Sequence, residues 1–270
     1  MKNLVALVLL LAALLAGVAF YQRRASVPEG ANGATAPTAP LTVFCAASLK
    51  KSLETIAEQY RKDTGVEVRL QFGGSGTLLS SLRVAKQGDL YLPVDEGSVA
   101  DARKAEVVRD ALPIAIQRPV LVVRKGNPKK IYTLDDLLRD EVKTALANPE
   151  AASISRVSRK ALGEQWDKLA AHATVMKPTV TEVAADVNLG TVDAGIIWDT
   201  VAAQFKDTEA VKVPELSDIK ENASACVLSF STQPEAALRF ARYLTAPDKG
   251  GAVFQANGFT PAGGAKWADK

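Results

Sequence analysis

The sequence predicts an α/β protein with two lobes, and two observations carry this prediction. From residue 41 onward, segments with strand character alternate with segments with helix character, which is the pattern of mainly parallel sheets flanked by helices. Two such series are present, one on each side of an extended stretch over residues 113–124 that Pro119 interrupts. We therefore expect the chain to cross to a second lobe near residues 110–125 and to return near residues 205–230.

The first series contains three predicted strands, over residues 41–46, 66–72 and 89–94. A helix is expected after each of the first two strands, because apolar residues recur there at helical spacing. In the first helix these residues are Leu49, Leu53, Ile56, Ala57 and Tyr60, and in the second they are Leu78, Leu82 and Ala85.

The second series contains predicted strands over residues 142–147, 175–180 and 194–198, with helices after the first two. A strand over 224–231 is expected to return to the first lobe, followed by a closing helix with Ala237, Phe240, Ala241 and Leu244 on one face. The predicted first lobe therefore comprises residues 41–122 plus 225–270, and the second comprises residues 123–224. In α/β folds of this kind, ligands bind outside the carboxyl ends of the strands, which here places a cleft between the lobes.

The N-terminal segment is predicted to direct export. Residues 4–20 are an almost unbroken apolar run after Lys2, so residues 1–24 are interpreted as a signal peptide or a membrane anchor. Residues 25–40 are rich in Ala, Pro, Gly and Thr, as is typical of a flexible linker. The folded part is therefore expected to be periplasmic or extracytoplasmic, either secreted or tethered to the membrane through residues 4–20.

Composition excludes several functional classes. The formal net charge is +3, of which residues 1–40 carry +2, and such a nearly neutral body argues against a nucleic-acid partner. His172 is the single histidine, so a metal site with several histidines is excluded, and we expect no protein-ligated metal cation. Cys45 and Cys226 form either one disulfide or two buried thiols, and the second alternative is slightly favoured.

Two serines follow neighbouring strands at predicted helix starts. Ser48 comes directly after the strand over 41–46, where it is expected to be the N-cap of the next helix. Ser75 lies in the segment Gly-Gly-Ser-Gly-Thr over residues 73–77, after the second strand. One interpretation is local: Ser48 only caps its helix, and the glycines only form a turn. The other is that both helix starts bind an anion with hydroxyl and backbone N–H groups.

Enzymatic interpretations of these serines lack the companion residues that they require. The pattern around Ser75 is G-x-S-x-T, without the second glycine of a nucleophile elbow, and it does not match the nucleotide-binding glycine motifs. Residues 48–51 match S-x-x-K, but the sequence has no S-D-N or K-T-G partner motif. A serine hydrolase that uses Ser48 or Ser75 therefore remains only as an alternative.

Six segments occur in an order and spacing that resemble a known family. They are LTVFCAASLKKSLETIAEQY, FGGSGTLL, GDLYLPVD, ANPEAASISRVSRKAL, VDAGIIWDT and the ending FARYL…ANGFTP. Over about residues 41–262 the chain resembles the periplasmic molybdate-binding proteins of ABC importers, which have the two-lobed type II solute-binding fold. The resemblance implies a monomeric binding protein without catalytic activity or cofactor, which captures molybdate or tungstate and delivers it to the permease of an ABC transporter.

The resemblance also implies a set of ligand-binding residues. Two serine hydroxyls match Ser48 and Ser75, and two backbone N–H groups match Ile154 and Val180. Trp198 occupies the position of a tyrosine whose hydroxyl binds the oxyanion in the family. Its indole N–H can only donate, so this departure indicates a bond of altered reach, a changed ligand or a plain aromatic wall.

The chemistry of these groups agrees with an oxyanion ligand. A fully ionised oxyanion has only acceptors, so a site made of neutral donors suits it, whereas protonated phosphate needs an acceptor. Asp199, next to Trp198, is the nearest such acceptor in the sequence. Two further alternatives stay open: a binding protein for another ligand, such as sulfate, a phosphonate or an iron chelate, and a sensory or scaffold domain held at the membrane by residues 4–20.

Overall fold

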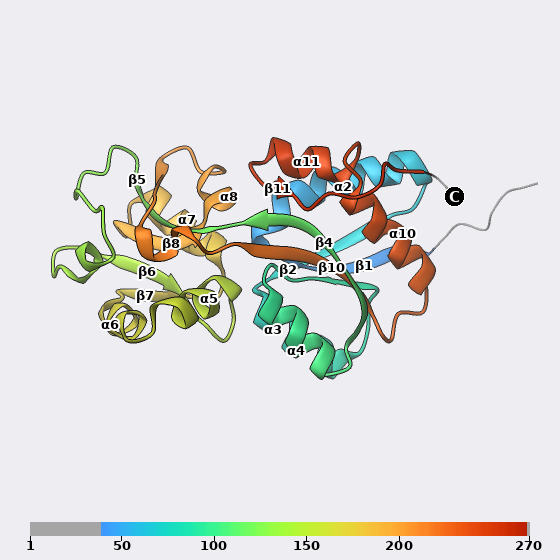
Figure 1. Cartoon of the computed structure of the whole chain (residues 1–270), viewed down its shortest axis with the longest axis horizontal. Helices are drawn as coiled ribbons and strands as arrows, with labels where there is room; N and C mark the ends of the chain where they lie inside the picture. Colours follow the sequence, from blue (N-terminus) through green and yellow to red (C-terminus); the bar gives the residue numbers. More distant parts are fainter. Residues whose placement is uncertain (1–38, 269–270) are drawn as a thin grey trace, which may run out of the picture. The chain divides into compact units, whose positions relative to one another are not determined.

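The computed structural model describes residues 39–268, whose strands form two sheets (Figure 1). The predicted signal peptide or anchor over 1–24, and residues 25–38 of the predicted linker, lie outside the described residues. The first lobe is built on a six-stranded sheet in the order β11-β4-β10-β3-β1-β2, and the second on a five-stranded sheet in the order β7-β6-β8-β5-β9.

The first lobe contains both ends of the described chain. Its strands are β1 (Leu41–Ala46), β2 (Val68–Gly73), β3 (Leu90–Leu92), β4 (Val108–Gln117), β10 (Glu221–Leu228) and β11 (Thr260–Pro261). Its helices are the 3₁₀ turn η1 (Ala47–Leu49), α2 (Lys50–Thr64), α3 (Ser75–Ala85), α4 (Glu96–Lys104), α10 (Pro234–Thr245) and α11 (Gly250–Ala256).

The second lobe is formed by the intervening chain. Its strands are β5 (Pro119–Arg124), β6 (Thr144–Ala147), β7 (Val175–Lys177), β8 (Ala194–Trp198) and β9 (Thr208–Val211). Its helices are η2 (Asp135–Leu138), α5 (Ser153–Leu162), α6 (Glu164–His172), α7 (Val180–Leu189), α8 (Asp199–Ala202) and α9 (Pro214–Ser217).

Both sheets are mixed, whereas the sequence predicted mainly parallel ones. β1 runs parallel to β2 and β3, and β6 runs parallel to β7 and β8. The strands next to the crossings are antiparallel to their neighbours: β10 pairs with β3 and β4, and β5 pairs with β8 and β9. Parallel neighbours in one sheet are usually joined by a crossover helix. The strands at the crossings enter their sheet from the other lobe rather than through such a helix, and they pair antiparallel.

Each sheet gains a strand where the chain crosses between the lobes. The second sheet begins at Pro119, and the first sheet resumes at Glu221. Arg118 separates β4 from β5, so the predicted extended stretch divides there into one strand for each sheet. Because Pro119 has no backbone N–H, a continuous ladder is interrupted at this point.

Helix α2 shows how sequence pattern and packing agree in the first lobe. Its predicted apolar face is buried, and Gly65 ends the helix in the left-handed conformation with φ of 76°. Tyr60 packs edge-to-face against Phe240 and Tyr243 of α10, with ring centroids 4.8 and 4.9 Å apart. These contacts join the first helix of the lobe to the returning C-terminal segment.

Five of the seven predicted strands have different bounds in the structure. Those expected over 89–94, 142–147 and 224–231 are β3 (Leu90–Leu92), β6 (Thr144–Ala147) and β10 (Glu221–Leu228). The strand expected over 66–72 is β2, Val68–Gly73. The strand expected over 175–180 ends at Lys177, and Val180 is already the first residue of α7. The side chain of Thr179 accepts a hydrogen bond from the N–H of Glu182, which fixes the helix start at this position.

Cys45 and Cys226 are free and buried, as the favoured alternative predicted. Cys45 lies on β1 opposite Leu92 of β3, and Cys226 lies on β10 opposite Tyr91 of β3. A complete strand therefore separates the two thiols, about 9–10 Å at the usual strand spacing, which is too far for a disulfide. Burial raises the pKa of both thiols, that of Cys226 to about 12.

Among residues 39–268, no helix has the length and apolar character that crossing a membrane requires.

Candidate functional site

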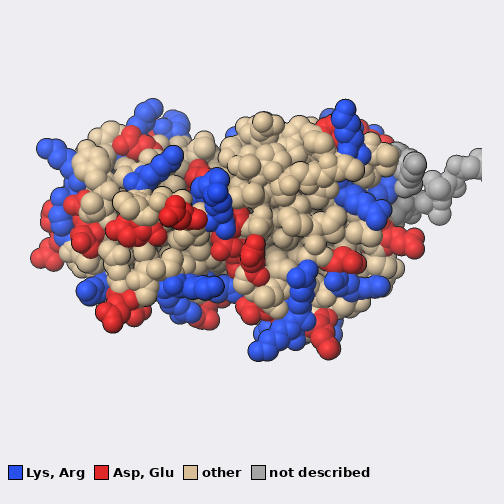
Figure 2. Space-filling view, in the orientation of Figure 1, with Lys and Arg blue, Asp and Glu red and all other residues tan. Residues whose placement is uncertain are grey.

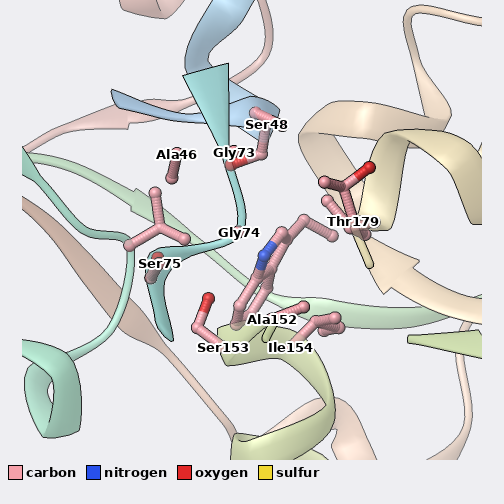
Figure 3. A pocket seen from close by; sticks show the side chains of 13 residues that line it. Ala46, Ser48, Gly73, Gly74, Ser75, Ala152, Ser153, Ile154 and Thr179 are labelled. Carbon is pink, nitrogen blue, oxygen red and sulfur yellow. The ribbon is translucent and has the colours of Figure 1, made fainter. Parts of the chain in front are cut away.

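One small cavity is enclosed by loops and helix starts of both lobes (Figure 3). Its lining comes from the segments after β1, β2 and β3 in the first lobe, and from the starts of α5 and α7 and the end of β8 in the second. The thirteen lining residues are Ala46, Ala47, Ser48, Gly73, Gly74, Ser75, Val94, Ala152, Ser153, Ile154, Thr179, Val180 and Trp198. All five residues that the sequence singled out, Ser48, Ser75, Ile154, Val180 and Trp198, therefore lie around the same cavity.

The cavity is narrow and its lining is uncharged. The space open to the centre of a water-sized sphere is about 10 Å³, roughly that of a single water position. None of the thirteen lining residues is Asp, Glu, Lys, Arg or His. Within residues 39–268, no three His, Cys, Asp or Glu side chains are grouped so that they could hold a metal ion. The site therefore offers neutral hydrogen-bond donors in a setting of low dielectric constant.

Ser48 does not cap its helix, in contrast to the prediction. The N-cap of η1 is Ala46, and Ser48 lies inside the 3₁₀ turn that precedes α2. Its side chain is 1% exposed, and its hydroxyl has no hydrogen-bond partner among the described residues. The local interpretation of Ser48 is therefore wrong, because the hydroxyl bonds to no backbone group of its own helix.

Ser75 is the first residue of α3, after the N-cap Gly74. Its hydroxyl is likewise buried and unpartnered among the described residues. Its carbonyl oxygen accepts a hydrogen bond of 2.8 Å from the Tyr91 hydroxyl, which fixes the backbone at this position. A buried hydroxyl without a partner costs about 1–3 kcal/mol of stability. Two such hydroxyls on one cavity are available to a ligand that accepts hydrogen bonds.

The glycines around Ser75 allow a close approach, but to the second lobe. A Cβ on Gly74 would lie 2.3 Å from the carbonyl oxygen of Ala151, and one on Gly76 would lie 2.1 Å from that of Glu150. The N–H of Gly76 donates to the Ala151 oxygen over 2.9 Å. The glycine-rich segment thus lets the two lobes meet beside the cavity, a role that the sequence pattern alone does not distinguish from ligand contact.

Helices α5 and α7 contribute backbone donors from the second lobe. Ile154 is the second residue of α5 and Val180 is the first residue of α7, so their N–H groups lie in first turns that lack intrahelical acceptors. The partial positive charge of a helix start favours an anion there. The Thr179 hydroxyl is already engaged, since it accepts from the N–H of Glu182 and donates to the Glu182 carboxylate.

Asp199 and His172 have other contacts. Asp199 is absent from the cavity lining, and its carboxylate accepts from the N–H groups of Arg118 and Thr200 over 3.0 and 2.9 Å. His172 lies at the end of α6, with Nε2 3.3 Å from the Arg139 carbonyl oxygen, and it does not line the cavity either. A Ser–His nucleophile requires a histidine within hydrogen-bond reach of the serine, and the structure places none beside Ser48 or Ser75.

An ion-pair cluster, here called the interlobe clasp, joins the lobes beyond the cavity. Arg156 of α5 contacts the Asp95 carboxylate and the Ser98 hydroxyl in the first lobe, and it reaches Asp101 over 2.9 Å. The Asp95 side chain is 1% exposed, and it also caps α4 through the N–H of Ser98 over 2.8 Å. The sequence analysis missed this contact because Arg156 and Asp95 are 61 positions apart.

Ser153 is a cavity residue that the sequence analysis also missed. It is the first residue of α5, directly before Ile154. The segment NPEAAS places a hydroxyl at a helix start just as the segments around Ser48 and Ser75 do, so the signal was present in the sequence.

Comparisons with known proteins bear on the family and the fold of the chain. The family described as "Bacterial extracellular solute-binding protein" matches residues 41–260. The molybdate-binding protein ModA of Mycobacterium tuberculosis is 28% identical over 220 residues, which are 79% of this chain and 82% of that protein.

Two solved structures share the fold. The periplasmic molybdate-binding protein of Azotobacter vinelandii has a TM-score of 0.66 at 18% identity, covering 82% of this chain and 98% of that one. The sulfate-binding protein SubI of Mycobacterium tuberculosis has a TM-score of 0.71 at 20% identity, covering 83% and 87%. With the two-lobed type II architecture and the family match over most of its length, this chain belongs to the bacterial extracellular solute-binding proteins, which act outside the cytoplasm.

Proposed function

We propose that this protein captures a fully ionised tetrahedral oxyanion, molybdate or tungstate, and delivers it to the permease of an ABC importer. The observation that carries the proposal is a pair of buried hydroxyls on one uncharged cavity, those of Ser48 and Ser75, which have no hydrogen-bond partner in the described part of the chain. The relative named as a molybdate-binding protein supports the choice of ion. The protein acts as a carrier rather than as an enzyme, and it works as a monomer without a cofactor.

The donor set explains why the ion would be fully deprotonated. Hydroxyl, indole and backbone N–H groups can all donate, and no carboxylate lines the cavity to accept a proton from the ligand. Charge-assisted hydrogen bonds of this kind are about twice as strong as neutral ones, and a dry cavity strengthens them further. Hydrogen phosphate would have to donate to a serine oxygen and would thereby lose one of these bonds.

The size of the cavity supports a small ion. The narrow cavity favours a small ion over a larger ligand such as a sugar phosphate or an iron chelate. In the proposed complex, Ser48 and Ser75 donate from the first lobe, and the N–H groups of Ile154 and Val180 donate from the second. Trp198, 1% exposed, closes one wall and offers its indole N–H as a further donor.

The two lobes, proposed above as residues 41–122 plus 225–270 and residues 123–224, would close around the ion by a hinge motion at the β4–β5 and β10 crossings. In this proposal the protein works in the periplasm or on the outer face of the membrane. The apolar segment 4–20 serves either as a cleaved signal or as a tether.

Calorimetric titration of the purified protein with molybdate, tungstate, sulfate and phosphate tests the proposal. We expect tight 1:1 binding of molybdate and tungstate, with much weaker binding of phosphate. Tighter binding of sulfate would favour the second candidate, a sulfate carrier, which the fold shared with SubI and the tryptophan at position 198 make a specific alternative. No heat with any of the four ions would contradict the proposal.

A further inference from the structure

We propose that Ser153 supplies a third ligand-binding hydroxyl, from the second lobe, so that the ion is held by serine side chains of both lobes. This inference rests on the proposed function and adds a binding residue to it. Its starting point is the position of Ser153 on the cavity, next to the proposed backbone donor Ile154.

The Ser153 hydroxyl is available for a ligand. The residue is 5% exposed and lines the cavity, and capping does not occupy its hydroxyl, because Ala152 rather than Ser153 is the N-cap of α5. Figure 3 shows its oxygen directed toward the space between the labelled residues, on the same side as Ser75. Like the hydroxyls of Ser48 and Ser75, it is a polar group that is almost fully buried at the cavity wall.

Helix geometry explains why capping does not occupy this hydroxyl. An N-cap side chain bonds to N–H groups of the first turn, but Ser153 is the first residue inside α5, and the N-cap is Ala152. Thr179 provides the contrast: it is the N-cap of α7, and capping occupies its hydroxyl. The sequence of α5 thus places alanine where a capping serine would ordinarily be and places the serine one position later, facing the cavity.

A ligand-binding hydroxyl in the second lobe couples binding of the ion to closure of the two lobes. Ser48 and Ser75 are both in the first lobe and could hold the ion while the lobes are apart. Ser153 and the N–H groups at the starts of α5 and α7 reach the ion only when the second lobe closes. The ion therefore makes more contacts in the closed form than in the open form. This difference in affinity between the two forms is what shifts the population toward the closed one.

The test compares Ser153→Ala with Ser155→Ala in calorimetric titrations with molybdate and in thermal unfolding without it. Ser155 is the matched control, because it lies on the same helix, is 1% exposed and has an unpartnered hydroxyl among the described residues, but it does not line the cavity. We expect S153A to bind molybdate roughly 10- to 100-fold more weakly, the loss of one hydrogen bond to a charged group. S155A should bind within about twofold of the wild type, the change expected where no ligand bond is lost.

The outcomes separate this inference from the proposed function. Equal affinity of S153A and the wild type would overturn the role of Ser153 alone. Unfolding of S153A in the absence of ligand, with S155A intact, would also overturn it, because the hydroxyl has no proposed part in folding. If the wild type binds none of the oxyanions, the proposed function fails, and the inference fails with it.

Discussion

Ser48 and Ser75 are the two side chains on which the proposed binding depends most, because each hydroxyl is buried without a partner among residues 39–268. Replacing either by alanine removes an unsatisfied polar group, so the unliganded protein should keep its stability or gain up to about 1 kcal/mol. The same variants should bind molybdate roughly 10- to 100-fold more weakly. Thermal unfolding and calorimetric titration measure the two effects.

Ser52→Ala is the matched control for these variants. Ser52 lies on α2 with a buried, unpartnered hydroxyl among the described residues, but it is not part of the cavity lining. Its replacement should leave molybdate affinity unchanged. A similar loss of affinity in S52A and S48A would show that the effect comes from helix packing rather than from the ligand.

Trp198 stands where the resemblance to molybdate-binding proteins implies a tyrosine, and two of its candidate roles, a donor and an aromatic wall, are separable. Trp198→Phe keeps an aromatic wall and removes the indole N–H, while Trp198→Tyr provides a hydroxyl donor. If the indole donates to the ion, W198F should lose roughly tenfold or more in affinity, and W198Y should retain more of it. Equal affinity of both variants and the wild type would leave Trp198 as a wall only.

The two thiols provide a prediction about the core. Cys45 and Cys226 are buried with raised pKa values, so the folded protein should resist alkylation by iodoacetamide at pH 8. Both thiols should react once the protein is unfolded in denaturant, as intact-mass spectrometry would show. Rapid labelling of the folded protein, or an oxidised mass after unfolding, would contradict the arrangement of β1, β3 and β10.

At the scale of elements, the glycine-rich segment at the start of α3 is expected to control closure. Gly76→Ala would place a Cβ 2.1 Å from the Glu150 carbonyl oxygen, a backbone atom that cannot move aside on its own. The variant should therefore fold but close incompletely, with a large loss of molybdate affinity and a larger radius of gyration in the presence of the ion. A compact, tightly binding G76A protein would show that the lobes do not meet at this loop.

Helix α5 carries the interlobe clasp, which we expect to slow release of the ion. In Arg156→Gln the buried Asp95 loses its charged partner in the closed form, so dissociation should be at least about tenfold faster, with little change in association. Stopped-flow kinetics measures both rates.

Arg159→Gln, one turn along α5, is the control for R156Q. The Arg159 pair with Glu150 is exposed and lies within the second lobe, so its loss should have little effect. Equal release rates in the two variants would exclude a role for the clasp.

Sequence pattern predicted some elements well and others poorly, for physical reasons. The strands at 41–46 and 194–198 have the predicted bounds because they are buried apolar runs. Short elements such as β9 and β11 leave little periodicity to detect. Ser48 and Ser75 were predicted from their positions after neighbouring strands, and Ile154, Val180 and Trp198 from the resemblance; all five lie on one cavity. The roles of Gly74 and Arg156 depend on contacts between lobes, which no local pattern records.

For the whole molecule, the charge distribution fits a carrier that holds an anion with neutral groups. On the face shown in Figure 2, Lys and Arg are interspersed with Asp and Glu over both lobes. This pattern differs from the clustered basic side chains of nucleic-acid-binding surfaces. We therefore assign the attraction of the ion to the hydrogen-bond donors of the cavity rather than to charged side chains on the surface. Because salt screens mainly exposed charges, the affinity for the ion should fall only modestly between 50 and 500 mM NaCl.

The central claim is that the two first-lobe serines and the helix starts of the second lobe hold one oxyanion between them. A crystal structure of the protein with tungstate tests this most directly, because the anomalous signal of tungsten locates the ion independently of the protein atoms. The account predicts a single strong peak with tungstate oxygens within about 3 Å of Ser48 Oγ and Ser75 Oγ. A peak elsewhere, such as in the outer groove beside Lys50 and Lys51, or an empty cavity in crystals that contain the ion, would contradict it.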